Sequence, residues 1–570
     1  MKVSDYIVSF FIERGITDVF GYPGGMVTHL MDSLSKYSDK ISAHVNYHEQ
    51  GSAFAACGYA QASLKPGVAY ATSGPGATNL VTGIANAYFD SIPTIFITGQ
   101  VNTYESKGNF PLRQKGFQEM DVVAVTSSIT KYCVQITDSK DVRYHLEKAY
   151  HMSLSGRPGP VLLDIPMNIQ RADINLEESP RFENLRSDDL SYLQKILCEI
   201  EAALEKAKRP CILVGAGVQS GNVQEEFAAW IEKIKVPVVS SMLAVDILPL
   251  SQYYYGFVGA YGSRCANFIL AKSDLIISLG TRMDLRQTGA NTDKFAVNAR
   301  LIRIDIDSNE LSNKVKVHEE SYISNLKDLQ PLLTQSRRDC PLSYSDWIVT
   351  CNEMKNKLEN IDDLEPNRIV QKLSGLIDAD TIITTDVGQN QVWVAQSFIA
   401  RGQRILFSGG HGAMGYSLPA AIGAHYGSGK KIVAFTGDGG LQMNIQELQF
   451  IAREQLPITI ILLNNSSLGM IRHFQEMYFD KNYVQTKKQG GYTTPDFGEI
   501  ASAYGILYYK SFGVSNIEKL DSLFSCVGPS LIEVVMEDDT YVFPKLAMGK
   551  LNQDQDPELN RELYEYLSDL

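Results

Sequence analysis

The chain has 570 residues, of which 44% are hydrophobic and 21% charged, and its formal net charge is −13. This length exceeds what one hydrophobic core supports, so we expect about three or four domains of a soluble globular protein. The acidic balance argues against a nucleic-acid or anionic-membrane partner, since either would need a basic surface.

The amino-terminal stretch MKVSDYIVSFFIERG has Asp5 and Glu13 on either side of its apolar residues. It therefore does not resemble a secretory signal, and no run approaches the roughly 18 apolar residues of a membrane span. The eight cysteines form no C-x-x-C pair. We therefore expect a cytoplasmic protein with neither a zinc site nor a disulfide framework, in which oxygen atoms would hold any metal.

Short β-branched runs that end in glycine alternate with helical stretches along the whole chain. Such continuous apolar strands, interleaved with helices, predict an α/β fold with doubly wound parallel sheets. The strands are expected at 68–76, 94–100 and 160–166, then at 211–217, 237–241, 275–280 and 301–307, and finally at 381–388, 431–440, 458–465 and 531–536.

Two polar, acidic stretches, 173–190 and 335–366, interrupt this rhythm and predict linkers. We therefore expect three doubly wound parallel-sheet domains at 1–172, 191–334 and 366–548, followed by an acidic C-terminal tail at 549–570. The segment VAYATSGPG from Val68 also resembles VAFTGDGG from Val433. The first and third domains are thus expected to share an architecture.

The segment VNYHEQGSAFAACGYAQ (45–61) predicts a helix of small side chains with one carboxylate, Glu49, at its start. One interpretation is that Glu49 favours the positive end of the helix dipole. The other is that this acid serves a partner supplied from elsewhere.

The segment FTGDGGLQMN (435–444) joins a buried strand to a helix, and its glycines allow backbone N–H groups to approach an anion. Asp438 would repel a phosphate unless a cation lay between them. The next strand ends in Asn464 and Asn465, one strand–helix–strand unit later. Because magnesium takes few protein ligands and completes its shell with phosphate oxygens and water, Asp438 and Asn465 predict a magnesium–diphosphate clamp.

Further motifs follow in a fixed order, and in them the chain resembles the acetohydroxyacid (acetolactate) synthases, which are thiamine diphosphate enzymes. The resemblance implies a pyrimidine-binding, a central and a diphosphate-binding domain, pyruvate as substrate, and a homodimer or dimer of dimers. The motifs are FGYPGG (20–25), HEQGSAFAACGYA (48–60), TSGPGATNLVTGIANAYFDSIP (72–93), ITGQV (97–101), FQEMD (117–121), SGRPGPVLLDIP (155–166), VGQNQVWVAQ (387–396) and GAMGYSLPAAIGA (412–424).

The resemblance gives Glu49 a partner, because the family's Glu hydrogen-bonds N1′ of the aminopyrimidine and favours the tautomer that deprotonates C2. It also implies that the Ser467 carbonyl joins Asp438 and Asn465 on the metal. Met414 is implied to bend the cofactor, with ordinary core packing as the alternative. The remaining implied cofactor contacts are Pro23, Gly24, Thr72, Asn79, Val387, Gly388, Gln389, Gly412, Gly437, Gly439, Gly440 and Met470.

The central segment CILVGAGVQSG places glycines at 215, 217 and 221, one residue longer than the dinucleotide fingerprint, so a nicotinamide site is not expected. The resemblance implies FAD without a redox role, and an empty domain is the alternative. The residues that match the family's flavin contacts are Arg157, Gly215, Ala216, Gly217, Ser241, Met242, Leu243, Gly280, Arg282, Asp305 and Ile306.

The family decarboxylates pyruvate and adds the hydroxyethyl carbanion to a second 2-ketoacid. By resemblance, Gln118 and Phe117 lie beside the reacting carbons, and Arg286 meets the acceptor carboxylate. The chain departs from the family at four pocket positions, and the loss of a cation and of two large side chains predicts a roomier and less charged acceptor site. Phe474 replaces a tryptophan, Met167 a lysine and Ala260 a methionine, and Met26 replaces a small residue.

These departures leave an alternative open, namely a carboligase that acts on a keto-sugar or another non-ketoacid acceptor. A second alternative belongs to another class, a non-catalytic homologue that only binds the cofactor. The presence of Glu49, Asp438 and Asn465 argues against this second alternative.

Overall fold

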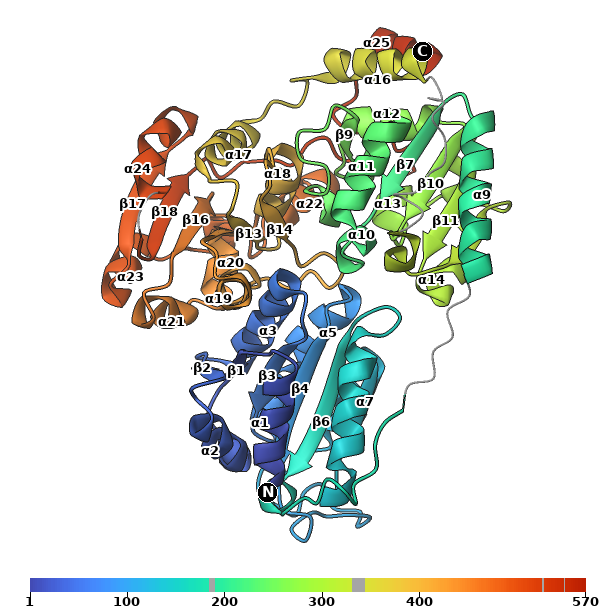
Figure 1. The fold of residues 1–570 in the computed structure, drawn as a ribbon. Helices are drawn as coiled ribbons and strands as arrows, with labels where there is room; N and C mark the ends of the chain where they lie inside the picture. The colour runs from blue at the N-terminus through green and yellow to red at the C-terminus, as the bar shows by residue number, and fades with distance from the viewer. Residues whose placement is uncertain (184–189, 331–343, 525–526, 548) are drawn as a thin grey trace.

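The computed structural model describes residues 1–183, 190–330, 344–524, 527–547 and 549–570 (Figure 1). These residues form three six-stranded sheets, one after another along the chain, and the paired strands within them run parallel. This confirms the predicted fold class. We call each sheet with its helices the first, central and third unit. No helix in the described ranges is long and apolar enough to cross a membrane.

The first unit has the strand order β2-β1-β3-β4-β6-β5. Alternate residues of each strand face opposite sides, so Val68 and Tyr70 pack with α1, α2 and α7, whereas Ala69 and Ala71 face α3 and α5. The strands are β1 (Asp18–Gly21), β2 (Ser42–Val45), β3 (Gly67–Ala71), β4 (Thr94–Gln100), β5 (Tyr132–Gln135) and β6 (Pro160–Pro166), and the helices are α1 (Val3–Glu13), α2 (Thr28–Lys36), α3 (Glu49–Ser63), α4 (Pro75–Asn79), α5 (Val81–Phe89), α6 (Val122–Thr126), α7 (Val142–Leu154) and α8 (Met167–Arg171).

The third unit repeats this strand order as β14-β13-β15-β16-β18-β17, which confirms that the two units share an architecture. Its strands are β13 (Ile382–Thr385), β14 (Arg404–Leu406), β15 (Ile432–Gly437), β16 (Ile458–Asn464), β17 (Leu507–Phe512) and β18 (Ser530–Val535), and its helices are α17 (Glu365–Leu376), α18 (Gln389–Ser397), α19 (Ser417–Ser428), α20 (Asp438–Met443), α21 (Glu447–Arg453), α22 (Gly469–Tyr478), α23 (Phe497–Tyr504) and α24 (Asp521–Phe524).

The central unit has a different order, β12-β11-β10-β7-β8-β9. If the six strands are numbered 1 to 6 along the chain and the sheet is read from β9 to β12, the order is 3-2-1-4-5-6. This is the strand order of dinucleotide-binding sheets, in which ligands lie where the order reverses. The strands are β7 (Pro210–Val214), β8 (Val238–Ser240), β9 (Tyr254–Phe257), β10 (Leu275–Leu279), β11 (Arg300–Asp305) and β12 (Glu320–Ile323), and the helices are α9 (Leu190–Lys206), α10 (Gly217–Ser220), α11 (Gln224–Ile234), α12 (Arg264–Lys272), α13 (Leu285–Thr288) and α14 (Ser308–Ser312).

The first and third units share one hydrophobic core, because α3 lies directly against α19 (Figure 1). Small residues allow this approach. A Cβ added at Gly58 would lie 2.0 Å from the Ala420 carbonyl oxygen, and one added at Gly423 would lie 1.8 Å from that of Ala55. The small-residue pattern of 45–61 is thus explained by backbone-to-backbone packing between units.

Two segments are more ordered than the sequence predicts. Part of the predicted linker 335–366 forms α16 (Ser345–Leu358), which packs against α12, with Trp347 buried. Within the predicted tail 549–570, α25 (Arg561–Asp569) also packs against α12. These helices form because apolar residues recur at helical spacing among the polar ones and add to the central core. Of the linker 173–190, residues 184–189 lie outside the described residues, as do 331–343.

Candidate cofactor site

Glu49 is the first residue of α3, and its side chain is only 7% exposed. The helix begins there because the preceding His48 is extended and its Nδ1 accepts a hydrogen bond from the Gln50 N–H, as an N-cap does. The Asn79 Nδ2 donates to the Glu49 Oε2 at 2.9 Å. Two of the predicted residues thus meet at the carboxyl edge of the first sheet.

Other predicted residues gather around this carboxylate. A Cβ at Gly76 would lie 2.8 Å from the Thr72 methyl and 3.1 Å from the Glu49 Oε1, and one at Gly24 would lie 2.4 Å from Thr72. The Thr72 hydroxyl accepts from the Met26 N–H at 3.2 Å. Pro23 is exposed beside Gly24. The structure therefore brings the motifs at 20–26, 48–60 and 72–79 into one cluster.

Gln118 reaches the same edge from a loop. Its backbone has φ 61°, and its carbonyl oxygen lies 2.9 Å from where a Cβ of Gly74 would be. Gln100 supports this loop, since its Nε2 donates to the Met120 carbonyl at 2.8 Å. Phe117 is 78% exposed, and Met167 is half-buried at the start of α8.

The predicted metal ligands meet at the ends of β15 and β16, which are paired neighbours. Asp438, Asn465 and Ser467 are 2%, 5% and 3% exposed. Burial raises the pKa of Asp438 to about 6, opposed by hydrogen bonds from Tyr492 and from backbone N–H groups at 465 and 467. The Tyr492 hydroxyl, which the sequence analysis missed, donates to the Asp438 Oδ2 at 2.9 Å.

Side chains behind Asn465 fix its orientation. Its Nδ2 donates to the Gln389 Oε1 at 3.0 Å and to the Thr540 Oγ1 at 2.7 Å. The amide oxygen therefore points away from these partners and accepts from the Ser467 N–H at 3.2 Å. A carboxylate, an amide oxygen and a nearby carbonyl are the hard oxygen ligands that magnesium takes.

The region next to Asp438 at the ends of the strands has little side-chain bulk, and we call it the cradle. Gly388 precedes α18 with φ 137°, a conformation that favours glycine, and Val387 lies before it. The half-buried Met414 places its methyl 3.2 Å from where a Cβ of Gly439 would lie, so it borders the cradle and is no core residue. Of the remaining predicted residues, Gly437 ends β15, Gly440 lies in α20, Met470 lies in the first turn of α22, and Gly412 lies in the loop before α19.

Two buried polar atoms here lack a hydrogen-bond partner among the described residues, the Ser73 Oγ and the Asn390 Oδ1. Each follows a predicted cofactor residue, Thr72 and Gln389 respectively. Unpaired buried polar atoms are costly, so both fit a polar ligand. In the described part of the chain, no three His, Cys, Asp or Glu side chains lie together as a possible metal centre.

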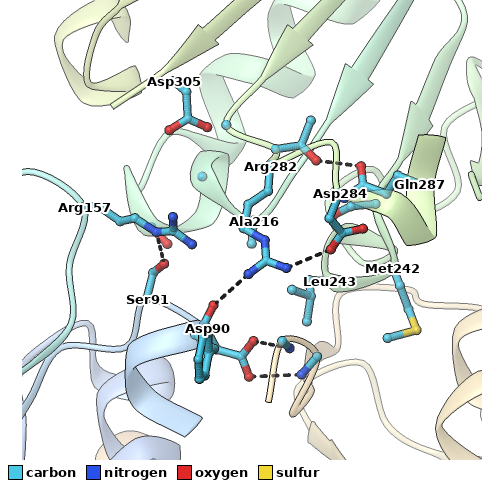
Figure 2. A pocket seen from close by; sticks show the side chains of 18 of the residues that line it. Asp90, Ser91, Arg157, Ala216, Met242, Leu243, Arg282, Asp284, Gln287 and Asp305 are labelled. Atoms are coloured by element: carbon cyan, nitrogen blue, oxygen red, sulfur yellow. Dashed lines mark hydrogen bonds and ion pairs between the residues drawn. The ribbon is translucent and has the colours of Figure 1, made fainter. Parts of the chain in front are cut away.

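A cavity of about 220 Å³, partly open to solvent, lies between the three units (Figure 2). It begins where the central strand order reverses, between the ends of β7 and β10. Ten of the eleven predicted flavin residues line it. Gly215 does not, but a Cβ there would lie 2.2 Å from the Gly280 carbonyl, so it keeps the two loops close.

Two of the three arginines on the cavity wall, Arg157 and Arg282, have acidic partners. Arg157 contacts Asp307 at 3.1 Å and Glu310 at 2.6 Å, and it donates to the Ser91 hydroxyl at 2.7 Å. Arg282 bridges Asp284 at 2.8 Å, as Figure 2 shows. A pyrophosphate would compete with these carboxylates for guanidinium groups that already face the cavity.

The residue pair Phe89 and Asp90 at the end of α5 connects all three units, and the sequence did not predict it. The Asp90 carboxylate accepts from the Gly409 and Gly410 N–H groups at 3.0 and 2.6 Å, and Arg282 of the central unit donates to the neighbouring Phe89 carbonyl (Figure 2). Withdrawal from water raises the pKa of Asp90 to about 6, against the pull of the two N–H groups and the arginines. A lone Asp after a helix gives no sequence signal for such a role.

The acceptor residues lie in three places. Arg286 and Ala260 line the central cavity, and the Ala260 N–H donates to the Arg286 carbonyl at 2.7 Å. Phe474 lies on α22 of the third unit, where its ring is 4.6 Å from the ring of Tyr478 and tilted by 50°. Met26, Phe117, Met167 and Gln118 instead lie on the first unit.

Comparisons with known proteins agree with this geometry. Family models described as the N-terminal binding domain, central domain and C-terminal binding domain of thiamine pyrophosphate enzymes match residues 1–125, 197–332 and 386–534. The fold and site therefore define a thiamine pyrophosphate enzyme.

Curated relatives narrow the family. The chain is 36% identical over 560 residues to the acetolactate synthase large subunit of Lactococcus lactis, covering 96% of this chain and 94% of that one. It is 34% identical over 563 residues to the acetolactate synthase isozyme 2 large subunit of Escherichia coli, covering 97% and 99%. It is 34% identical over 575 residues to the chloroplastic acetolactate synthase of Arabidopsis thaliana, covering 96% and 83%. The chain belongs to the acetolactate synthase family.

Proposed function

We propose that the protein is a thiamine diphosphate- and magnesium-dependent carboligase that decarboxylates pyruvate and joins the remaining two carbons to a carbonyl acceptor. With pyruvate as acceptor the product is acetolactate. The observation that carries the proposal is the buried Asp438 beside Asn465 at the ends of two paired strands, in a chain that also buries Glu49 at a helix start. The relatives are named acetolactate synthases, so a keto-sugar acceptor and a non-catalytic role are not favoured.

In this proposal Asp438, Asn465 and the Ser467 carbonyl hold magnesium, and backbone N–H groups of 437–440 face the diphosphate. The Glu49 carboxyl binds N1′ of the aminopyrimidine. Since it is nearly shielded from water, one hydrogen bond to it counts strongly in setting the tautomer. When bound, thiamine diphosphate supplies the nucleophilic carbon and accepts the electron pair released by decarboxylation.

We further propose that two copies of the chain complete each site, as a homodimer or dimer of dimers. Within one chain the Glu49 carboxylate bonds to Asn79 of its own unit, whereas Asp438 bonds to Tyr492 of the third unit. The loop beside Gln118 exposes Tyr104, Phe110, Leu112 and Phe117, by 64%, 68%, 49% and 78%. Such apolar exposure favours contact with another copy.

Co-expression tests this arrangement. Glu49→Gln and Asp438→Ala chains are each expected to be inactive alone, whereas mixed dimers should regain activity because one of their two sites keeps both residues. Absence of recovery, in dimers shown to be mixed, would contradict sites shared between chains.

For the central cavity we propose FAD without a redox role. The dinucleotide strand order, the glycine contacts and the arginines facing the cavity support it. The purified protein should take up FAD in stoichiometric amount, seen as flavin absorbance that is not bleached during turnover. A colourless protein that stays fully active would mean an empty cavity.

The acceptor pocket is proposed to be permissive, since Phe474, Met167 and Ala260 are smaller or less charged than their family counterparts. A cytoplasmic location belongs to the same proposal, and cell fractionation tests it. The deciding experiment incubates the protein with pyruvate, thiamine diphosphate and magnesium, with and without 2-ketobutyrate or a keto-sugar, and identifies the products. Cofactor binding without pyruvate turnover would contradict the proposed activity.

A further inference from the structure

A carboxylate from the third unit holds the turn that precedes Glu49. Glu447, the first residue of α21, is fully buried. Its Oε2 accepts from the Asn46 Nδ2 at 2.9 Å, and its Oε1 accepts from the Tyr47 N–H at 3.0 Å. The His48 N–H also donates to this carboxylate. Three consecutive residues before Glu49 are thus fixed by one side chain about 400 residues away in sequence.

Gly51 leaves the space that this contact needs. A Cβ at position 51 would lie 2.4 Å from the Glu447 Oε1 and 2.9 Å from its carboxyl carbon. The carboxylate therefore lies against the first turn of α3, where unpaired N–H groups and the helix dipole favour a negative charge. Any larger residue at 51 would push this charge away from the turn that carries Glu49.

We propose that Glu447 is a positioning residue, which fixes the first turn of α3 and thereby aims the Glu49 carboxyl at the cofactor. This inference rests on the role proposed for Glu49. Glu447 touches no reacting atom in the proposal. It acts through Asn46 and the backbone of 47–48, and it makes the third unit responsible for the geometry of an acid carried by the first.

The charge state of Glu447 bears on this role. Burial raises its pKa to about 7, opposed by the hydrogen bonds from Asn46, Tyr47 and His48 and by the charge of Arg453. As the pH falls through about 7 the carboxyl gains a proton, and an acceptor oxygen is lost where only donors face it. The titratable groups on the packed elements are Tyr47 and His48 before α3, Arg453 on α21, Tyr426 on α19 and Tyr504 on α23.

Glu447→Gln tests the proposal, because it keeps the size of the side chain but sets an NH₂ group against donors. We expect kcat to fall about 10- to 100-fold, since a displacement near 1 Å can cost about 100-fold in rate. Thiamine diphosphate affinity should change by less than about threefold, because the diphosphate clamp is untouched. The loss of kcat below about pH 7 in the parent enzyme should be absent from the variant. Hydrogen exchange of the amides at 46–51 should quicken.

Two further variants separate positioning from general damage. Combining Glu447→Gln with Asn46→Asp exchanges donor and acceptor, so part of kcat should return. Gly51→Ala keeps the glutamate at position 447 but displaces its carboxylate, so this variant should lower kcat in the same way. The control is Glu499→Gln, an exposed carboxylate on α23, which also packs against α21. It should leave kcat and its pH profile unchanged.

The outcomes distinguish this inference from the proposed function. A parent enzyme that forms no acetolactate would contradict the function itself. An active parent whose Glu447→Gln variant keeps its kcat and pH profile would overturn the positioning role alone. So would a variant that only unfolds more easily while its folded fraction turns over normally.

Discussion

Replacing Gly58 by alanine tests whether the close packing of α3 against α19 is needed for the proposed catalytic role of Glu49. The added Cβ would lie 2.0 Å from the Ala420 carbonyl oxygen and within 3 Å of two more backbone atoms. Contacts below 3.0 Å are not tolerated, so the helices must separate by about 1 Å. Because the obstructing atoms belong to the backbone, no side-chain rotation relieves the clash.

The magnitude follows from two opposing terms. Overpacking costs about 1–3 kcal/mol of stability. We take the upper value because the atoms that the added Cβ meets belong to the backbone of Ala420 and the Cβ itself cannot rotate away. Alanine is favoured over glycine within a helix by about 1 kcal/mol, which leaves a net loss of about 2 kcal/mol. The unfolding entropy is about 2.1 cal/mol/K per residue, so for a chain of 570 residues each kcal/mol lowers the thermal midpoint by about 0.8 °C, and we expect a fall of about 1–2 °C. The same displacement at Glu49 can lower kcat by up to about 100-fold.

Thermal unfolding and steady-state acetolactate formation check both numbers. The control is Gly375→Ala on α17, an exposed glycine whose added Cβ would meet nothing within 4 Å. It should gain about 0.5–1 kcal/mol and leave kcat unchanged. Ala420→Gly should not rescue Gly58→Ala, because the obstructing atom is a carbonyl. A Gly58→Ala variant with an unchanged midpoint and kcat would refute the argument from close packing.

Three further predictions concern the site. Asp438→Ala should abolish magnesium-dependent binding of thiamine diphosphate in calorimetry, because it removes the charged ligand; unchanged affinity would rule out the clamp. Glu49→Gln should keep the fold and much of the cofactor affinity but lose about 10²- to 10⁴-fold in turnover, so near-normal rates would exclude the proposed proton chemistry. In competition, 2-ketobutyrate should be only slightly preferred over pyruvate, because a loosened pocket forfeits most of the about 1–3 kcal/mol of one methylene; a bias of about fifty-fold would show a tight pocket.

Local sequence predicted eleven of the eighteen described strands, and it placed the proposed metal ligands at the ends of two of them. Buried strands appear as short continuous apolar runs, and a parallel strand–helix–strand unit brings the ends of neighbouring strands to one edge of the sheet. Asp438 and Asn465 therefore had to lie close once β15 and β16 were adjacent, as they are. The resemblance to a known family added roles for residues, such as Glu49, whose local pattern left two interpretations open.

The sequence also contains a periodic pattern that indicates α16. In α16 the buried Trp347, Cys351, Met354 and Leu358 recur at helical spacing, yet the polar residues between them favoured a linker. A count of periodicity in that segment would have predicted the helix.

Contacts between units were decided only by the tertiary structure. Nothing in the local sequence pairs Glu447 with Asn46, Gly58 with the Ala420 carbonyl, or Asp90 with Gly410. The wall of the central cavity likewise comes from all three units, and Arg286 lies there beside the residues predicted to contact a flavin. The physical reason is that hydrophobic periodicity and turn residues report only local structure, which each segment forms with residues close to it in the chain. Which faces of two folded units pack together depends on shape and burial summed over many residues. Such a sum produces no periodic pattern in the sequence.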